Sequence, residues 1–149
     1  MSNTKNLFRP SAYFKPTSLA EATKLLERYD GKGWLLAGGT DLLVEKNPQV
    51  EVLIDITGLG LAYIKSDGQG IRIGATTTFA DIIASPILQK SPYNVLVQAA
   101  REIGTPQIRN VATIGGNICH AVPSADSAPV LLILDATLTV VGSTGQRLI

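Results

Sequence analysis

The chain has 149 residues, of which 45% are hydrophobic and 17% charged, with a formal net charge of +1. This composition is typical of a globular domain and excludes a disordered chain. The near-neutral charge, without a basic tract longer than two residues, gives no indication of a nucleic-acid partner. A single cysteine, Cys119, excludes an internal disulfide framework and a multi-cysteine metal site.

The sequence gives no indication of a membrane span. The longest apolar run, PVLLILDA, is far too short to cross a bilayer, and the first residues, MSNTKNLFRPSAYFKP, lack the apolar core of a signal peptide. We therefore expect a cytoplasmic protein. The mean hydropathy of +0.21 fits either a surface that another chain or domain covers or a well-packed small domain.

The first third of the chain alternates helix and strand. Ser18 and Glu21 have the spacing of a capping box, and apolar residues at helical spacing predict a helix that Gly31 ends. A buried strand is expected at residues 34–37, followed by a glycine turn and a short helix. EVLIDIT, residues 51–57, predicts another strand.

The remaining segments predict a hairpin and then mainly helices. Asp67-Gly68 is a strong turn signal between two alternating runs, which predicts a β-hairpin. Pro106 interrupts the helical pattern, since the residue before a proline disfavours helix. Helices are expected at TFADIIAS, NVLVQAAREIG and SADSAPVLLILDA, although the last apolar run also fits a strand, and TLTVVGS predicts a final strand. The closing residues RLI look like a strand cut short, which suggests a fragment, or else a frayed terminus.

Two stretches share one design: LLAGGTDLL (35–43) and ATIGGNICHA (112–121). Each has an apolar lead-in, a Gly-Gly pair and a small hydrogen-bonding residue, Thr40 or Asn117. Glycine permits positive φ and close approach of a ligand, and successive N–H groups in such a turn can form an anion-binding nest. Because neither stretch contains lysine or arginine, this pattern suits a pyrophosphate that is retained rather than a phosphate that is transferred.

The familiar nucleotide-binding motifs are absent. There is no G-x-x-x-x-G-K-[ST] loop, and the G-x-G in GKGWLL precedes its strand instead of following it. One Gly-Gly pair alone is more often an ordinary tight turn. Two matching pairs in one small domain favour a ligand.

LLAGGTDLL together with TIGGNICHAVPSADSAP resembles the FAD-binding subunit or domain of the molybdenum hydroxylases. That family includes xanthine dehydrogenase and the medium subunit of the aerobic carbon monoxide dehydrogenase. The resemblance extends over nearly the whole chain, including RPSAYFKPTSLAEATKLL and AREIGTPQIRNVA. The two motifs at this separation are far more specific than either alone.

The resemblance implies an α+β fold, the two-lobed FAD-binding fold of the vanillyl-alcohol oxidase or PCMH type. Residues 1–57 would form the small FAD-binding lobe. Residues 58–149 would form the N-terminal part of the larger lobe, which would be incomplete, and the C-terminal domain of the family would be absent. FAD would lie between the lobes, bound noncovalently.

The resemblance also assigns cofactor contacts residue by residue. The residues that match the first motif, and would wrap the pyrophosphate, are Leu36, Ala37, Gly38, Gly39, Thr40, Asp41 and Leu42. Those that match the second motif are Thr113, Ile114, Gly115, Gly116 and Asn117. Asp126 matches a carboxylate that hydrogen-bonds polar FAD atoms, and Ile103 aligns with a position whose side chain lies near the cofactor.

The implied function is that of an FAD-dependent oxidoreductase subunit for electron transfer. Substrate oxidation would occur at the molybdenum cofactor of a large partner subunit, and electrons would pass through [2Fe–2S] clusters of a small subunit to FAD. The acceptor would be NAD, oxygen or a quinone-linked acceptor. Since the flavin performs the redox chemistry, no catalytic residue is expected in this chain.

Two alternative functions stay open. The chain could be a non-catalytic assembly or binding domain of the same fold that does not retain FAD. A peptidoglycan-precursor reductase of the same wider fold fits less well, because its catalytic polar residues cannot be located here.

Five polar residues allow more than one interpretation. Cys119 and His120 could carry a covalent flavin link, but a buried thiol and a hydrogen-bonded loop histidine are the favoured interpretation. Asp126 could cap the following helix, alone or together with a cofactor contact. Asp41 is expected to act through its main chain at a helix start. Arg109 could pair with an acidic group of a partner or a flavin phosphate, or lie on the surface.

Overall fold

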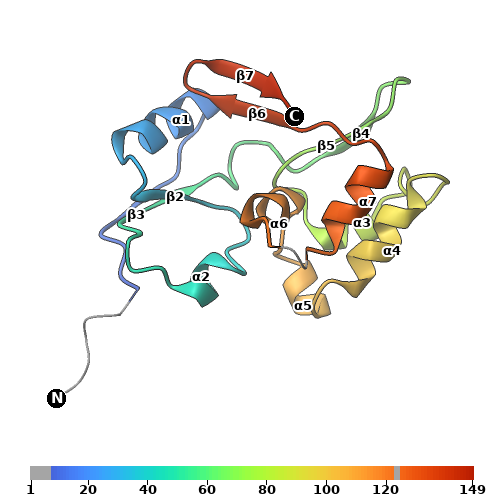
Figure 1. Ribbon diagram of the computed structural model, residues 1–149, viewed down its shortest axis with the longest axis horizontal. Helices are drawn as coiled ribbons and strands as arrows, with labels where there is room; N and C mark the ends of the chain where they lie inside the picture. Colours follow the sequence, from blue (N-terminus) through green and yellow to red (C-terminus); the bar gives the residue numbers. More distant parts are fainter. Residues whose placement is uncertain (1–7, 123–124) are drawn as a thin grey trace. The chain divides into compact units, whose positions relative to one another are not determined.

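The computed structural model describes residues 8–122 and 125–149 of the chain (Figure 1). Its internal contacts divide the chain into two compact units, which we describe separately. Unit 1 comprises the described residues up to Leu36, together with Asp41–Leu59 and Leu138–Ile149, and unit 2 comprises Ala37–Thr40 and Gly60–Thr137. The lobe boundary expected after residue 57 stays a prediction.

Unit 1 contains a parallel three-stranded sheet. Its strands are β1 (Ala12–Phe14), β2 (Gly33–Leu36) and β3 (Val52–Asp55), in the order β1-β3-β2. Because β3 is the central strand, Val52 and Ile54 form the buried core of this unit together with Ala22. Both strands expected in this region are present, and β2 begins and ends one residue earlier than the sequence predicts.

The helices of unit 1 begin where the sequence predicts them. Helix α1 (Leu19–Arg28) packs on the sheet, and the short helix α2 (Leu42–Glu45) follows the first glycine pair. The Ser18 hydroxyl accepts a hydrogen bond from the Glu21 N–H at 3.2 Å. The reciprocal half of the expected capping box is wrong, because the Glu21 carboxylate instead accepts from the N–H and hydroxyl of Thr17.

The last strands of unit 1 form a hairpin. Strand β6 (Thr139–Gly142) pairs antiparallel with β7 (Gly145–Leu148). The strand predicted from TLTVVGS is therefore confirmed, and Arg147 and Leu148 of the closing RLI belong to its partner strand.

A buried carboxylate lies at the end of the central strand of unit 1. Asp55 is only 6% exposed, and its side chain accepts hydrogen bonds from the Thr57 N–H at 2.8 Å, the Thr57 hydroxyl at 2.6 Å and the Tyr13 hydroxyl. The Lys15 Nζ lies 3.4 Å away. Burial alone would raise the pKa of Asp55, but the bonds from Thr57 and Tyr13 and the charge of Lys15 outweigh it and lower this pKa to about 2. Hydrogen bonding to Asp55 in turn raises the pKa of Tyr13.

Unit 2 consists mainly of helices around an apolar core. Its elements are the antiparallel hairpin β4 (Ile64–Ser66) and β5 (Ile71–Ile73), and the helices α3 (Phe79–Ala84), α4 (Asn94–Glu102), α5 (Pro106–Arg109), α6 (Ile114–His120) and α7 (Ser127–Ile133). Helix α4 packs against both α3 and α7 (Figure 1). The buried core residues are Phe79, Ile82, Leu88, Leu96, Val97, Ala100, Ile103, Ala112 and Ile114.

Most elements of unit 2 agree with the sequence predictions. The Asp67-Gly68 turn is present, with Gly68 at φ +83, and α3, α4 and α7 lie within the predicted helical segments. The start of the predicted segment SADSAPVLLILDA falls at Ser124, outside the described residues. The sequence predicts only a break at Pro106, whereas the structure shows a new helical turn there. Proline suits the first position of a helix, and Thr105 caps this one.

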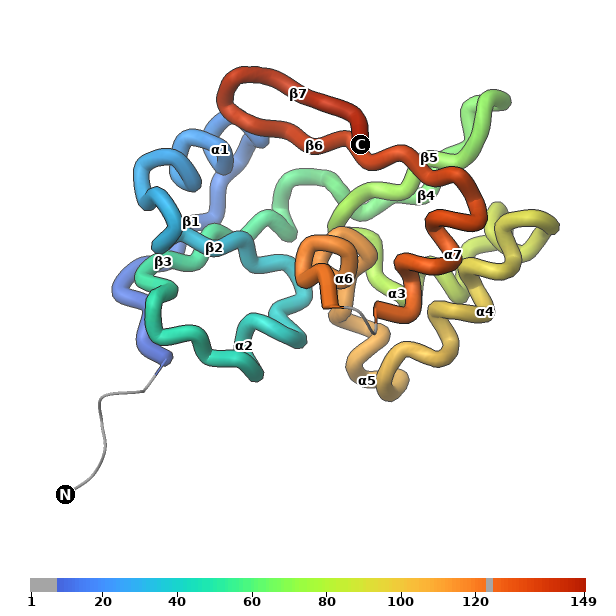
Figure 2. The backbone as a smooth tube through the Cα atoms, in the orientation of Figure 1, coloured from blue at the N-terminus to red at the C-terminus, as the bar shows by residue number. Residues whose placement is uncertain are grey.

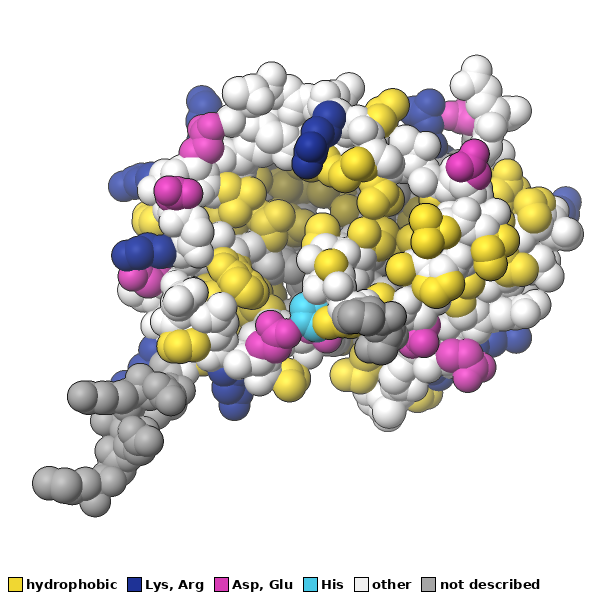
Figure 3. All heavy atoms as spheres, viewed as in Figure 1, with side chains coloured by type: hydrophobic (Ala, Val, Ile, Leu, Met, Phe, Trp, Pro, Cys, Tyr) yellow, Lys and Arg dark blue, Asp and Glu magenta, His cyan; other side chains and the backbone are white. Residues whose placement is uncertain are grey.

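Apolar side chains are exposed on part of unit 2. Leu132 and Ile133 of α7 are 81% and 78% exposed, and Figure 3 shows apolar side chains gathered over this helix. Within the described parts of the chain, no helix is long and apolar enough to cross a membrane.

Candidate functional site

The two glycine segments predicted to bind a ligand meet at Gly38, within unit 2. A Cβ atom on Gly38 would lie 2.0 Å from the carbonyl oxygen of Val111 and 3.1 Å from the Cα atom of Ala112. Figure 2 shows the chain that follows β2 running beside the chain that enters α6. Glycine is therefore required at position 38, because any side chain would displace the main chain just before the second segment.

The first glycine pair keeps the turn that the sequence predicts. Gly39 has φ +69, in the left-handed region that favours glycine. The N–H groups of Ala37, Gly38 and Gly39 donate to no oxygen in the described ranges. Asp41 lies at the N-cap position of α2, as expected for a residue at a helix start. This segment therefore presents free main-chain donors.

The turn predicted for the second glycine pair is wrong. Gly115 and Gly116 lie inside α6, and neither has a positive φ. The Thr113 hydroxyl caps this helix by accepting from the Gly116 N–H at 3.2 Å. Gly115 packs so closely that a Cβ atom there would lie 2.6 Å from the Ala75 carbonyl oxygen. Tertiary packing thus overrides the low helix propensity of glycine.

The anion-binding nest expected in the second segment is also wrong. Each of the first three N–H groups of α6 donates to a protein oxygen outside the regular helical bonds: Ile114 to Thr77 O at 3.0 Å, Gly115 to Ala75 O at 2.9 Å and Gly116 to Thr113 Oγ1 at 3.2 Å. A helix start normally leaves such donors for a ligand or for water. Here they bind the segment between β5 and α3 and the cap residue.

Sequence reasoning missed the role of that segment, residues 74–78. Besides accepting from α6, it lies beside the second glycine segment, because the Phe79 N–H at the start of α3 donates to the Ala112 carbonyl at 3.1 Å and Thr78 forms an antiparallel bridge with Thr113. The Thr76 hydroxyl in the same segment is buried and has no hydrogen-bond partner in the described structure. The three consecutive threonines in GATTTF favour an extended backbone, and this pattern could have indicated that the segment pairs with another part of the chain.

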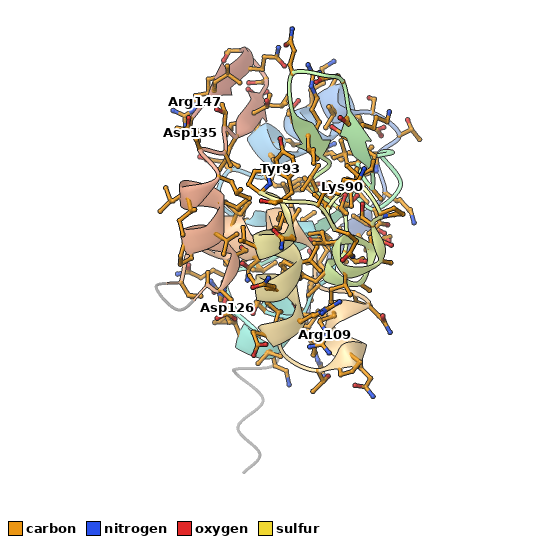
Figure 4. The ribbon with its side chains drawn as sticks, turned by 90° about the vertical axis from the view of Figure 1, so that its right-hand side faces the viewer. Lys90, Tyr93, Arg109, Asp126, Asp135 and Arg147 are labelled. Atoms are coloured by element: carbon orange, nitrogen blue, oxygen red, sulfur yellow. The ribbon has the colours of Figure 1, made fainter. Side chains whose placement is uncertain are left out.

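Asn117 and Asp126 both lie near the start of α7. The Asn117 Oδ1 accepts from the hydroxyl of Ser127, which is fully buried, so the amide is held with its Nδ2 group available as a donor. Asp126 lies at the lower end of α7 in Figure 4. Its side chain makes no capping bond, because its backbone is already helical, so the predicted capping role is wrong. Its contact with a cofactor stays a prediction.

Ile103 and Arg109 lie at the junction of α4 and α5. The Ile103 side chain is 9% exposed and belongs to the apolar core of unit 2, and its proximity to a cofactor stays a prediction. The Arg109 Nη1 group donates to main-chain carbonyls of residues 101, 103 and 104. This contact is not predictable from the sequence, because an arginine that binds carbonyls has no distinctive sequence pattern.

Cys119 and His120 end α6. Cys119 is exposed, so the predicted buried thiol is wrong, and His120 is the last helical residue instead of a loop residue. Both differences arise because α6 extends through these two residues, and adjacent side chains on a helix point in different directions. Across the described residues, no group of three or more His, Cys, Asp or Glu side chains could hold a metal ion.

Comparison with known proteins gives a consistent result. Residues 6–149 match the family described as "FAD binding domain in molybdopterin dehydrogenase". The xanthine dehydrogenase FAD-binding subunit of Escherichia coli O157:H7 is 40% identical, over 96% of this chain and 50% of the relative. The nicotinate dehydrogenase FAD-subunit of Eubacterium barkeri is also 40% identical, over 91% of this chain and 47% of the relative.

The structural comparison agrees. A chain of the carbon monoxide dehydrogenase from Hydrogenophaga pseudoflava superimposes with a TM-score of 0.90 and 36% identity, covering 95% of this chain and 50% of that chain. The chain therefore spans about half the length of the relatives it matches. The expected α+β FAD-binding fold is confirmed. The family match and this superposition together show that the chain belongs to the FAD-binding domains of the molybdopterin dehydrogenases.

Proposed function

We propose that this chain is the FAD-binding part of an electron-transfer subunit of a molybdenum-containing hydroxylase. The relatives are FAD subunits or medium chains of dehydrogenases for xanthine, nicotinate and carbon monoxide. Their substrates differ chemically, which fits substrate oxidation on another chain. FAD, when bound, would take electrons from [2Fe–2S] clusters of a small partner subunit and pass them to NAD or another acceptor. The acceptor and a cytoplasmic location stay predictions.

The free donors of the first glycine segment carry the proposal. The N–H groups of Ala37, Gly38 and Gly39 have no partner in the described ranges, and the left-handed φ of Gly39 belongs to the turn that can aim such groups at one anion. Residues 35–43 contain no lysine or arginine. Amide donors without a mobile cation fit a pyrophosphate that the protein retains. The residues of this motif that would surround it are Leu36, Ala37, Gly38, Gly39, Thr40, Asp41 and Leu42.

The second segment would contribute differently. Its first N–H groups are already used, so we assign Thr113, Ile114 and Gly115 to shaping the site through packing. Gly116 is exposed, and only the Thr113 hydroxyl lies close to where its Cβ would be. Asn117 would donate through Nδ2, and Asp126 would accept from a polar group of the cofactor.

The test compares two glycines with the same backbone conformation. Gly39 has φ +69 and Gly60, outside both glycine segments, has φ +68. Alanine at either position should cost about 1 kcal/mol of folding free energy, because L-residues are disfavoured in this region. FAD affinity, measured by flavin fluorescence on the purified protein, should fall at least about tenfold for Gly39→Ala and stay unchanged for Gly60→Ala.

Two results would count against the proposal. Equal loss of FAD affinity in both variants would show that the turn acts only through stability. A colourless wild-type protein that takes up no added FAD would instead favour the non-catalytic assembly domain.

A further inference from the structure

Arg109 makes an unusual set of contacts for a charged residue near a proposed phosphate site. Its Nη1 lies 2.7 Å from the carbonyl oxygen of Arg101, 3.0 Å from that of Ile103 and 3.2 Å from that of Gly104. These carbonyls lie at and just beyond the end of α4, where a helix cannot satisfy its own acceptors. Figure 4 shows Arg109 at the lower end of α4, opposite the end where Tyr93 lies.

The end of α4 depends on this side chain. The cap residue Ile103 is extended, with φ −72 and ψ 114, and no main-chain capping bond from it is observed. Arginine near a helix C-terminus can bind the last carbonyls and interacts favourably with the helix dipole. The Arg109 guanidinium therefore takes the place of the usual main-chain cap. The Arg109 side chain is half-buried, and its three hydrogen bonds hold it in this position.

Arg109 is also the last residue of α5, and the chain after it leads to the contact between Val111 and Gly38. The Ile108 carbonyl accepts from the Val111 N–H at 3.0 Å and from the Ala112 N–H at 2.7 Å. The Val111 carbonyl is in turn the group that faces Gly38. Arg109 therefore ties the end of α4 to the turn that sets the position of residues 111 and 112.

We infer that Arg109 is a positioning residue for both glycine segments, not a ligand of the cofactor phosphates. It holds α5 against the end of α4, and α5 places the Val111 carbonyl against Gly38 and the start of α6. The effect on FAD rests on the function proposed above. The effect on the main chain of residues 111–117 does not, and can be measured without flavin.

The experiment uses Arg109→Met and the matched control Arg101→Met. Both remove one arginine charge at the same end of α4, but Arg101 contributes only its carbonyl to the contact, which methionine retains. Hydrogen exchange on the flavin-free protein should be at least about tenfold faster at the hydrogen-bonded N–H groups of residues 111–117 in Arg109→Met, and unchanged in Arg101→Met. Arg109→Lys, which keeps a charged donor, should restore part of the protection.

FAD titrations at several salt concentrations separate positioning from direct binding. If Arg109 positions the segments, Arg109→Met should weaken FAD at least about tenfold with an unchanged dependence on salt, and the visible circular dichroism of bound flavin should change. A loss of affinity with a reduced salt dependence would identify a phosphate ligand and overturn the inference. So would a variant that melts earlier but exchanges and binds FAD like wild type. If wild type binds no FAD, the proposed function fails, whereas the exchange experiment still decides the role of Arg109.

Discussion

The Gly38–Gly39 pair leaves its N–H groups without partners in the described structure, whereas the Gly115–Gly116 pair donates both of its N–H groups to protein oxygens. In each pair the first glycine admits the protein's own main chain, Val111 at Gly38 and Ala75 at Gly115. The second glycines differ: Gly39 is left-handed and Gly116 is helical. Gly38–Gly39 thus presents free N–H donors, whereas Gly115–Gly116 uses its N–H groups to bind neighbouring segments of the protein.

The largest effect should come from Gly38→Ala. The added methyl group would lie 2.0 Å from the Val111 carbonyl oxygen, which forces the two segments apart. Urea unfolding should show a loss of about 3 kcal/mol or more, and FAD binding should disappear with it. Gly70→Ala is the matched control, because nothing lies within 4 Å of a Cβ there. Equal stability of the two variants would show that the close approach is not needed.

A change in unit 1 shows how much FAD affinity depends on stability alone. Asp55→Asn removes a carboxylate whose pKa is lowered to about 2 from an ordinary value of 3.8. A lowered pKa stabilises the folded state above pH 3.8, and this contribution is lost as the pH falls from there through about 2. The variant should lose about 2 kcal/mol at neutral pH, as measured by urea unfolding, and should lack this part of the acid sensitivity.

FAD affinity of the same Asp55→Asn variant should match wild type at temperatures where both are folded, because Asp55 lies in neither glycine segment. A tenfold loss of affinity would mean that the stability of unit 1 alone controls binding. The comparison of Gly39→Ala with Gly60→Ala could then no longer distinguish an effect on FAD binding from an effect on stability.

A smaller effect is expected for Thr113→Ala. This change removes the hydroxyl that accepts from the Gly116 N–H, and loss of such a cap costs about 1 kcal/mol. Thr78→Ala removes the equivalent cap of α3 and serves as control. Thermal melting should show a somewhat larger loss for Thr78→Ala, because the Thr78 hydroxyl also donates to the Asp81 carboxylate at 2.7 Å. If Thr113→Ala bound FAD more tightly, the released N–H would be acting as a ligand donor, and the contrast between the two glycine pairs would be wrong.

The sequence predicts the fold well where local patterns decide it. The helix after Ser18, the hairpin at Asp67-Gly68 and the central strand β3 each have periodicity or turn residues that determine them. The pairing of β3 between β1 and β2 depends on contacts between distant segments, so no local pattern predicts it. The turn of α5 does have a local pattern, Thr105 followed by Pro106, but only a break is predicted from it.

The candidate site was predicted only in part. The two glycine pairs were identifiable as related, but both were expected to form turns, because glycine disfavours helices. Contact with Ala75 and the cap at Thr113 make the second pair helical, and those partners lie outside its own motif. The role of Arg109 depends on carbonyl groups, which every residue has, so no residue type signals it.

The contact between Gly38 and Val111 joins residues 73 positions apart (111 − 38). During synthesis on the ribosome this junction cannot form until residue 111 has been added. All three strands of the parallel sheet of unit 1, by contrast, lie between Ala12 and Asp55. That sheet can pair at an earlier stage of synthesis, because its last strand is complete at Asp55. The donors of the first glycine segment therefore acquire their final arrangement only after the chain has been extended through Val111.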